Sequence, residues 1–232
     1  MIEVRPLSSL GGANHGWLDA HHHFSFAEYY DPKRMNWGRL RVWNDDVIAP
    51  KSGFPPHPHR DMEIITYVRT GAITHQDSMG NQGRTAAGDV QVMSAGTGVR
   101  HAEYNLEDES TTIFQIWIQP DRVGQPPRWG ARKFPKADRS GQWSILASGK
   151  GDEGALGIQA DARVAGVTLD AGQEIAWETE PDRHVYAVAA TGVIEVEGQT
   201  ASARDGVAAT GTSRVVFRAV EGPAEIVLTD TL

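Results

Sequence analysis

Two short stretches of the sequence each place two possible metal ligands one residue apart. His57 and His59 form a His-Pro-His pattern, and His101 and Glu103 form a His-Ala-Glu pattern. On a β-strand, side chains two positions apart point to the same face of the sheet. Each pair can therefore direct both of its side chains to one point. Two such strands lying side by side would bring three imidazoles and one carboxylate together, which predicts a metal site.

This set of ligands restricts the class of metal but does not select one metal. Neutral imidazoles and a carboxylate suit Fe(II), Mn, Co, Ni, Cu or Zn. The chain contains no cysteine, which excludes cysteine-ligated zinc, iron–sulfur clusters, thiol catalysis and disulfides. Four protein ligands leave an open position only on a five- or six-coordinate metal, which is usual for Fe(II).

Other residues compete for a place in this site. Glu63 follows His59 by four positions, on the same strand face, and is a rival carboxylate ligand. His75 precedes the turn of an expected hairpin and is a further candidate for lining the site. The run His21–His23 is interpreted as surface or inter-segment packing, and the isolated His184 as a structural or solvated residue.

The elements that must position these residues are predominantly β-strands. Short apolar, β-branched runs at residues 63–68, 90–93 and 113–118 each end at glycine or proline. Strands at this turn-punctuated spacing are typical of a sandwich or barrel. The same pattern returns at residues 184–190 and 193–198, where Thr-Gly between two runs predicts a hairpin. The chain is thus expected to hold two strand-rich halves, consistent with a diverged duplication.

The segment 120–142 interrupts this pattern. Its prolines and basic residues cluster, and the alternation of apolar and polar residues is lost. We interpret this segment as a connection between domains. The sequence therefore predicts a metal-binding domain over residues 1–120, a linker over 121–142 and a second domain over 143–232.

Composition restricts the classes of partner and compartment. The 232 residues include 22 Lys and Arg against 30 Asp and Glu, for a formal net charge of −8. An acidic surface disfavours direct binding to nucleic acid and to anionic membranes. No signal-peptide pattern and no apolar stretch of about 20 residues is visible, so we expect a cytoplasmic protein with no membrane contact.

The motifs resemble those of a known superfamily. His57-x-His59-x₃-Glu63 is similar to the first cupin motif, and Gly98-x₂-His101-x₃-Asn105 is similar to the second. Most of residues 14–118 also resembles the pirin family, and in particular the bacterial pirin-like quercetin 2,3-dioxygenases. The stretches that carry this resemblance are Asn14–Asp19, Phe24–Ala27, Leu40–Asp46, His57–Glu63, His75–Asn81 and Ser94–Asn105.

The resemblance implies an all-β bicupin, with two antiparallel jelly-roll β-barrels in one chain. It implies that the metal lies in the N-terminal barrel, bound by His57, His59, His101 and Glu103, and that the second barrel holds no metal. Among the carboxylates it favours Glu103 over Glu63. The sequence departs from its relatives at positions 21 and 23, where Trp and Thr are usual and this chain has histidine.

The implied activity is that of a metal-dependent dioxygenase, most simply with Fe(II), which cleaves a flavonol such as quercetin with O₂. Glu103 would be the catalytic general base for the flavonol 3-hydroxyl. A regulatory pirin-like protein that acts through protein partners is the alternative, and isomerisation or decarboxylation in another cupin-type site is a third. The candidate walls of an apolar substrate pocket are Phe54, Met93, Phe114, Ile116 and Trp117.

Overall fold

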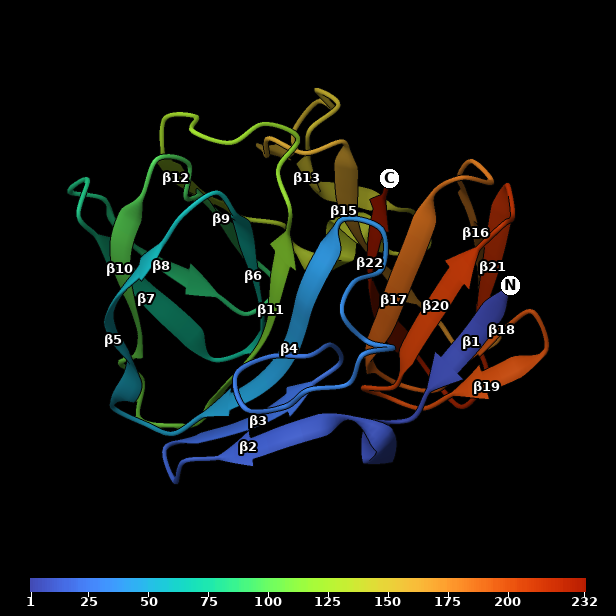
Figure 1. Cartoon of the computed structure of the whole chain (residues 1–232). Helices are drawn as coiled ribbons and strands as arrows, with labels where there is room; N and C mark the ends of the chain where they lie inside the picture. Colours follow the sequence, from blue (N-terminus) through green and yellow to red (C-terminus); the bar gives the residue numbers. More distant parts are fainter.

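The computed structural model describes residues 1–232 and contains twenty-two β-strands, two short 3₁₀ helices and no α-helix. The strands form four sheets, two with seven strands and two with four. One large and one small sheet make up each of two jelly-roll-like units, which lie next to each other (Figure 1). The expected all-β, two-domain cupin fold is confirmed, with open sheets in place of closed barrels. No helix is long and apolar enough to cross a membrane.

The first unit combines a seven-stranded sheet, in the order β12-β9-β6-β11-β4-β3-β2, with a four-stranded sheet, in the order β5-β10-β7-β8. Its strands are β2 (Gly11–Asn14), β3 (Leu18–His22), β4 (Leu40–Ile48), β5 (Ser52–His59), β6 (Glu63–Thr70), β7 (Ala72–Asp77), β8 (Gln82–Ala86), β9 (Val90–Ser94), β10 (Val99–Asn105), β11 (Thr111–Ile118) and β12 (Arg128–Arg132).

The second unit repeats this plan, with the orders β1-β20-β17-β22-β15-β13-β14 and β16-β21-β18-β19. Its strands are β1 (Ile2–Arg5), β13 (Ser144–Ser148), β14 (Leu156–Gly157), β15 (Ala162–Leu169), β16 (Glu174–Glu178), β17 (His184–Thr191), β18 (Ile194–Val196), β19 (Gln199–Ala201), β20 (Gly206–Thr210), β21 (Arg214–Ala219) and β22 (Ala224–Thr231). The 3₁₀ helices are η1 (Leu7–Ser9) and η2 (Lys136–Arg139).

Strand pairing departs from the expected domain limits in two places. Strand β1 pairs with β20, so residues 2–5 lie in the sheet of the second unit (Figure 1). Strand β12 pairs with β9 and extends the large sheet of the first unit, although it lies within the expected linker 121–142. The partner of each strand is remote in sequence, and local composition therefore did not reveal the pairing.

The two large sheets pack against each other through the largest apolar cluster of the molecule. This cluster of 22 buried residues includes Trp43 and Phe114 from the first unit and Tyr186 and Val227 from the second. A buried polar group adjoins it, because Glu225 on β22 accepts hydrogen bonds from the Tyr67 hydroxyl and from Arg139. The two units therefore share one core.

The interiors of the two units differ in polarity. A cluster of 18 buried apolar residues forms the core of the second unit. The first unit holds only two small apolar clusters, of 6 and 4 buried residues. Buried polar residues, including His75, His101 and Glu103, complete its interior. The second unit buries polar groups as well, since Asp230 accepts from Trp177 and Arg183, but the histidines paired with a carboxylate lie in the first unit.

Candidate metal centre

The two sequence stretches with paired ligands lie side by side. Strands β5 and β10 are antiparallel neighbours in the small sheet, with His57 opposite His101 and His59 opposite Val99. A β-bulge shifts the register between His101 and Glu103, so Glu103 lies opposite Phe54. The bulge places one more residue of β5 than of β10 between the two matched pairs, which local sequence did not indicate.

Three imidazoles converge at this register. The ring centroids of His57, His59 and His101 lie 4.5–4.9 Å apart, and a nitrogen of each lies within 4.8 Å of the others. The Nε2 atoms of His57 and His101 are 3.0 Å apart, close enough to bind one ion with bonds of about 2.1 Å. The other nitrogen of His57, Nδ1, donates to the Pro55 carbonyl at 2.7 Å, which leaves its Nε2 lone pair free. The donor set therefore fits a divalent metal.

Burial keeps two of these rings neutral. Burial, reinforced by the neighbouring histidines, lowers the pKa of His59 to about 4 and that of His101 to about 3. A neutral imidazole is the form that binds a metal. At neutral pH the two rings therefore present lone pairs without first losing a proton.

Glu103 lies deeper in the same interior and is 1% exposed. Its Oε1 accepts from Gln91 Nε2 at 2.6 Å and from Thr66 Oγ1 at 3.1 Å, and its Oε2 accepts from Gln115 Nε2 at 2.7 Å. A carboxylate oxygen of Glu103 lies within 4.8 Å of a nitrogen of both His101 and His75. The large sheet thus holds this carboxylate beside the histidines with three donors.

These donors belong to a row of polar side chains that crosses the large sheet. Adjacent strands pair His22 with Asn44, Asn44 with Gln115, Gln115 with Thr66, and Thr66 with Gln91. All five residues are buried, and His22 Nδ1 hydrogen-bonds Asn44 Oδ1 at 2.9 Å. We did not predict this row from sequence. The available signal was a polar residue on the otherwise largely apolar inward face of each strand, with a second one, Asp46, on β4.

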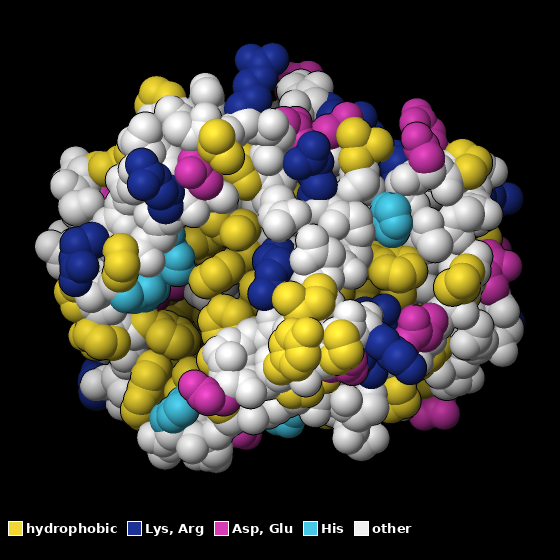
Figure 2. Space-filling model, in the orientation of Figure 1, with side chains coloured by type: hydrophobic (Ala, Val, Ile, Leu, Met, Phe, Trp, Pro, Cys, Tyr) yellow, Lys and Arg dark blue, Asp and Glu magenta, His cyan; other side chains and the backbone are white.

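Aromatic side chains border His57 and His59. Trp117 packs edge-on against His59, with ring centroids 5.0 Å apart, and Phe26 packs edge-on against Trp117 at 5.4 Å. Phe54 lies beside His57, with ring centroids 6.2 Å apart. Figure 2 shows hydrophobic side chains within a hollow next to histidine side chains. An apolar, planar molecule would fit against such a surface.

The candidate pocket walls divide between the two faces of the large sheet. Trp117 and Met93 pack with the inward apolar cluster of the first unit, and Phe54 packs with the other inward cluster. Phe114 and Ile116 instead belong to the core between the two units. Their assignment as pocket walls is therefore wrong, because they alternate with Gln115 and Trp117 along β11 and point the opposite way.

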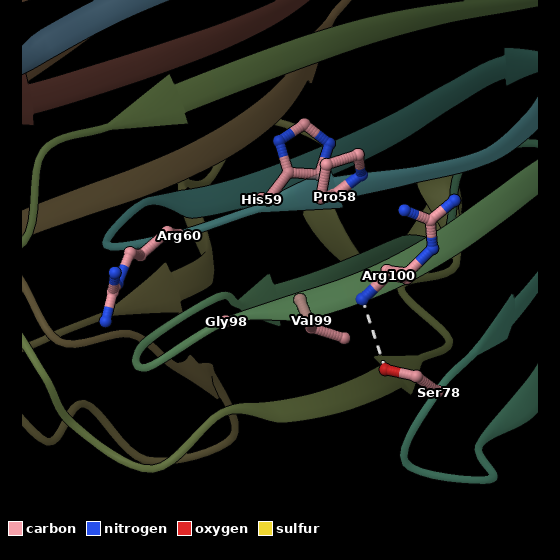
Figure 3. Close-up of a pocket in the computed structure, with 7 residues that line it drawn as sticks. All are labelled: Pro58, His59, Arg60, Ser78, Gly98, Val99 and Arg100. Atoms are coloured by element: carbon pink, nitrogen blue, oxygen red, sulfur yellow. Dashed lines mark hydrogen bonds between the residues drawn. The ribbon is translucent and has the colours of Figure 1, made fainter.

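A cavity of about 460 Å³ lies at the end of the histidine-bearing strands. His59 and Val99 line it together with the arginines that follow each of them, Arg60 and Arg100 (Figure 3). The backbone N–H of Arg100 donates to Ser78 Oγ at 3.1 Å. The rim of the candidate metal centre thus carries positive charge on an otherwise acidic protein.

Glu63, the rival carboxylate, lies on the opposite face of β6 from Thr66. Its Oε2 accepts from Ser94 Oγ at 2.6 Å, and it is 1% exposed. Burial raises its pKa, against the opposing hydrogen bond from Ser94. Strand alternation therefore directs Glu63 away from the interior that holds His101 and Glu103.

The remaining histidines take several roles. Of the run 21–23, only His22 faces the interior of the first unit; His23 Nδ1 contacts the Tyr186 hydroxyl at 2.8 Å, and His21 contacts Arg204 at 3.3 Å. His184, on β17 of the second unit, packs edge-on against Trp37, which precedes β4 of the first unit. These contacts agree with inter-segment packing, one of the two roles expected for the run 21–23; the inward position of His22 was not predicted.

A jelly-roll unit that holds converging histidines and a buried carboxylate, joined to a second jelly-roll unit, defines a two-domain cupin-type protein. The Pirin family model matches residues 3–118, and the model for the quercetinase C-terminal cupin domain matches residues 145–231. The chain belongs to the pirin family.

Named relatives agree with this assignment over the whole chain. A pirin-like protein from Caulobacter vibrioides is 61% identical over 99% of each chain. Quercetin 2,3-dioxygenase from Escherichia coli K12 is 41% identical over 99% of this chain and 98% of its own. The structure of bacterial pirin YhhW from Escherichia coli in complex with nickel(II) matches with a TM-score of 0.93, 39% identity, and coverage of 100% of this chain and 99% of that chain.

Proposed function

We propose that this protein is a metal-dependent dioxygenase that cleaves a flavonol such as quercetin with O₂. The observation that carries the proposal is the convergence of His57, His59 and His101 beside the buried carboxylate of Glu103, next to an aromatic hollow. We assign these four residues as the metal ligands. Relatives named quercetin 2,3-dioxygenase and the nickel(II) complex of a bacterial pirin support a metal-dependent dioxygenase.

The proposed metal is one divalent transition ion. Fe(II) suits three imidazoles and one carboxylate and retains open positions. Ni(II) suits the same ligands, and a pirin relative holds it. When bound, such an ion would polarise a substrate hydroxyl and favour reaction of the resulting oxyanion with O₂.

The residues of the chain would then position the substrate and move its proton. Glu103 would accept the proton of the flavonol 3-hydroxyl as general base. Gln91, Thr66 and Gln115 hold the carboxylate of Glu103, so it needs little reorganisation. Trp117 would pack against the planar aromatic rings and exclude water from the reacting atoms.

Oxygen uptake by the metal-loaded protein tests this proposal. We expect Fe(II)- or Ni(II)-loaded protein to consume O₂ when quercetin is added, and His57→Ala to bind no metal and consume none. His184→Ala, which changes a histidine of the second unit, is the matched control and should retain both properties. If the parent protein consumes no O₂ with either Fe(II) or Ni(II) bound, and its metal content is verified, the dioxygenase proposal is rejected. That result would favour a regulatory protein that acts through protein partners.

A further inference from the structure

The candidate ligand His101 is linked by its second nitrogen to a pair of residues that the proposed reaction does not use. His101 Nδ1 lies 3.4 Å from His75 Nδ1, and His75 Nε2 lies 3.0 Å from Asp77 Oδ2. All three side chains are buried, with His75 fully so. The contacts form a chain from a carboxylate, through one imidazole, to the imidazole whose Nε2 faces His57.

The carboxylate end of this chain is fixed by the turn between β7 and β8. Asp77 Oδ1 accepts from the backbone N–H groups of Met79 and Asn81, at 2.9 and 3.0 Å. The side-chain amide of Asn81 donates to both oxygens, at 3.2 and 2.9 Å. Asp77 therefore has one oxygen held by the backbone and the other directed at His75.

The middle of the chain is fixed by packing. The Trp129 indole stacks on the His75 ring, with centroids 4.9 Å apart and planes 10° apart. Gly83 lies opposite His75 on β8, and a Cβ at this position would overlap the indole. The absence of a side chain at Gly83 therefore makes room for Trp129, which limits rotation of the His75 ring.

The Asp77 carboxylate sets the proton positions on His75 and His101. An ionised carboxylate only accepts, so His75 carries its proton on Nε2 and has a bare Nδ1. His75 Nδ1 can then only accept, so His101 carries its proton on Nδ1 and has a bare Nε2. The Asp77 carboxylate thus selects the tautomer of His101 that directs a lone pair toward His57.

We propose that His75 and Asp77 are positioning residues of the metal centre, which fix the tautomer and the orientation of His101 for metal binding. This inference rests on the proposed metal site and adds two residues to it. Outer partners of metal-bound histidines act in this way in general, and their loss costs about 10- to 100-fold in metal affinity. Here two contacts, Asp77 to His75 and His75 to His101, connect the carboxylate to the metal ligand. One substitution at Asp77 can therefore reverse the proton position on His101.

Asp77→Asn is the informative variant. The amide has one acceptor oxygen, which the fixed N–H groups of Met79 and Asn81 will draw to the Oδ1 position. Its NH₂ group then faces His75 Nε2 and donates to it, and the Asn81 amide retains only its bond to the Oδ1 position. His75 must now carry its proton on Nδ1, which forces the proton of His101 onto Nε2, the nitrogen needed by the metal.

The experiment reads both proton positions and metal affinity. Long-range ¹H–¹⁵N spectra of the metal-free protein should show the Nδ1–H tautomer at His101 and the Nε2–H tautomer at His75, and Asp77→Asn should invert both. Competition of Ni(II) with a chelator should show affinity about 10- to 100-fold weaker in Asp77→Asn. Asp61→Asn, which removes the same charge two residues after His59, should retain the parent affinity within about twofold.

A second pair of variants keeps the test decisive if Asp77→Asn folds poorly. His75→Gln offers a carbonyl oxygen to His101 Nδ1–H and should retain most of the Ni(II) affinity, whereas His75→Leu should lose it by the same 10- to 100-fold. Parent-like affinity in His75→Leu, or an Nε2–H tautomer of His101 in the parent, would overturn the inference. A parent with the expected tautomers and tight Ni(II) binding but no oxygen uptake would contradict only the proposed dioxygenase activity.

Discussion

Glu103→Gln should perturb both the stability of the first unit and the proposed reaction. The carboxylate accepts two donors at Oε1, from Gln91 and Thr66, and one donor at Oε2, from Gln115. An amide has a single acceptor oxygen, which these donors will draw to the Oε1 position. Its NH₂ group then faces the NH₂ group of Gln115. Rotation of the Gln115 amide would relieve this conflict but would break its 3.3 Å bond from Trp117 Nε1.

The size of the effect follows from this count. Either arrangement leaves one buried donor without an acceptor, which costs about 1–3 kcal/mol of the free energy of unfolding. For a chain of this length that corresponds to a fall in melting temperature of roughly 2–12 °C. Loss of the general base should lower turnover by about 10²- to 10⁴-fold.

Thermal unfolding of the metal-free protein and oxygen uptake by the metal-loaded protein measure the two effects separately. Adding Gln115→Glu to Glu103→Gln returns one carboxylate and one amide to the pair, and keeps an acceptor for Trp117. This double variant should recover the melting temperature but not the turnover. Normal turnover in Glu103→Gln would refute its role as base, and an unchanged melting temperature would refute the hydrogen-bond reasoning.

Three further results are expected. Glu225→Leu should lower the free energy of unfolding, measured in urea, by about 3–5 kcal/mol, because it leaves the Arg139 guanidinium buried without a counter-charge. Adding Arg139→Met should restore most of that stability. Equal stability of the single and the double variant would contradict this reasoning. The parent protein should lose stability as the pH rises above about 4, and Asp46→Asn should abolish this loss. Burial, followed by the nearby charge of Asp45, raises the pKa of Asp46 well above its usual value, so the unfolded chain releases its proton first and parent stability declines as pH rises. A parent equally stable at pH 5 and pH 8 would show that Asp46 is ionised in the folded state. Glu63→Gln should leave the metal content unchanged by elemental analysis, and complete loss would show that Glu63, not Glu103, is the carboxylate ligand.

The sequence predicted a strand-rich fold, and it predicted that His57 shares a face with His59 and His101 with Glu103, because both depend on short-range spacing. That the two segments lie side by side in a bicupin was implied by the family resemblance. The sequence could not orient Phe114 and Ile116, because both faces of β11 are buried and apolar alternation is therefore absent there. For the same reason Gln115 did not stand out as a functional residue.

Other parts of the site depend on contacts between remote segments. Trp129 lies in the expected linker, and its stacking on His75 requires β12 to pair with β9 and Gly83 to be small. The β-bulge that sets the depth of Glu103 arises between two strands and has no local signature. Long-range pairing therefore accounts for most of what the sequence did not predict.

The pairing of β1 with β20 has a consequence for synthesis on the ribosome. Residues 2–5 leave the ribosome long before β20 is synthesised, so β1 remains unpaired while the first unit folds. The contacts between the two ends of the chain are highly non-local, which slows folding and leaves an unpaired edge exposed in the meantime. A nascent chain halted before residue 206 should therefore be more prone to aggregation than the finished protein, and a chaperone that binds extended segments would have its target at residues 2–5.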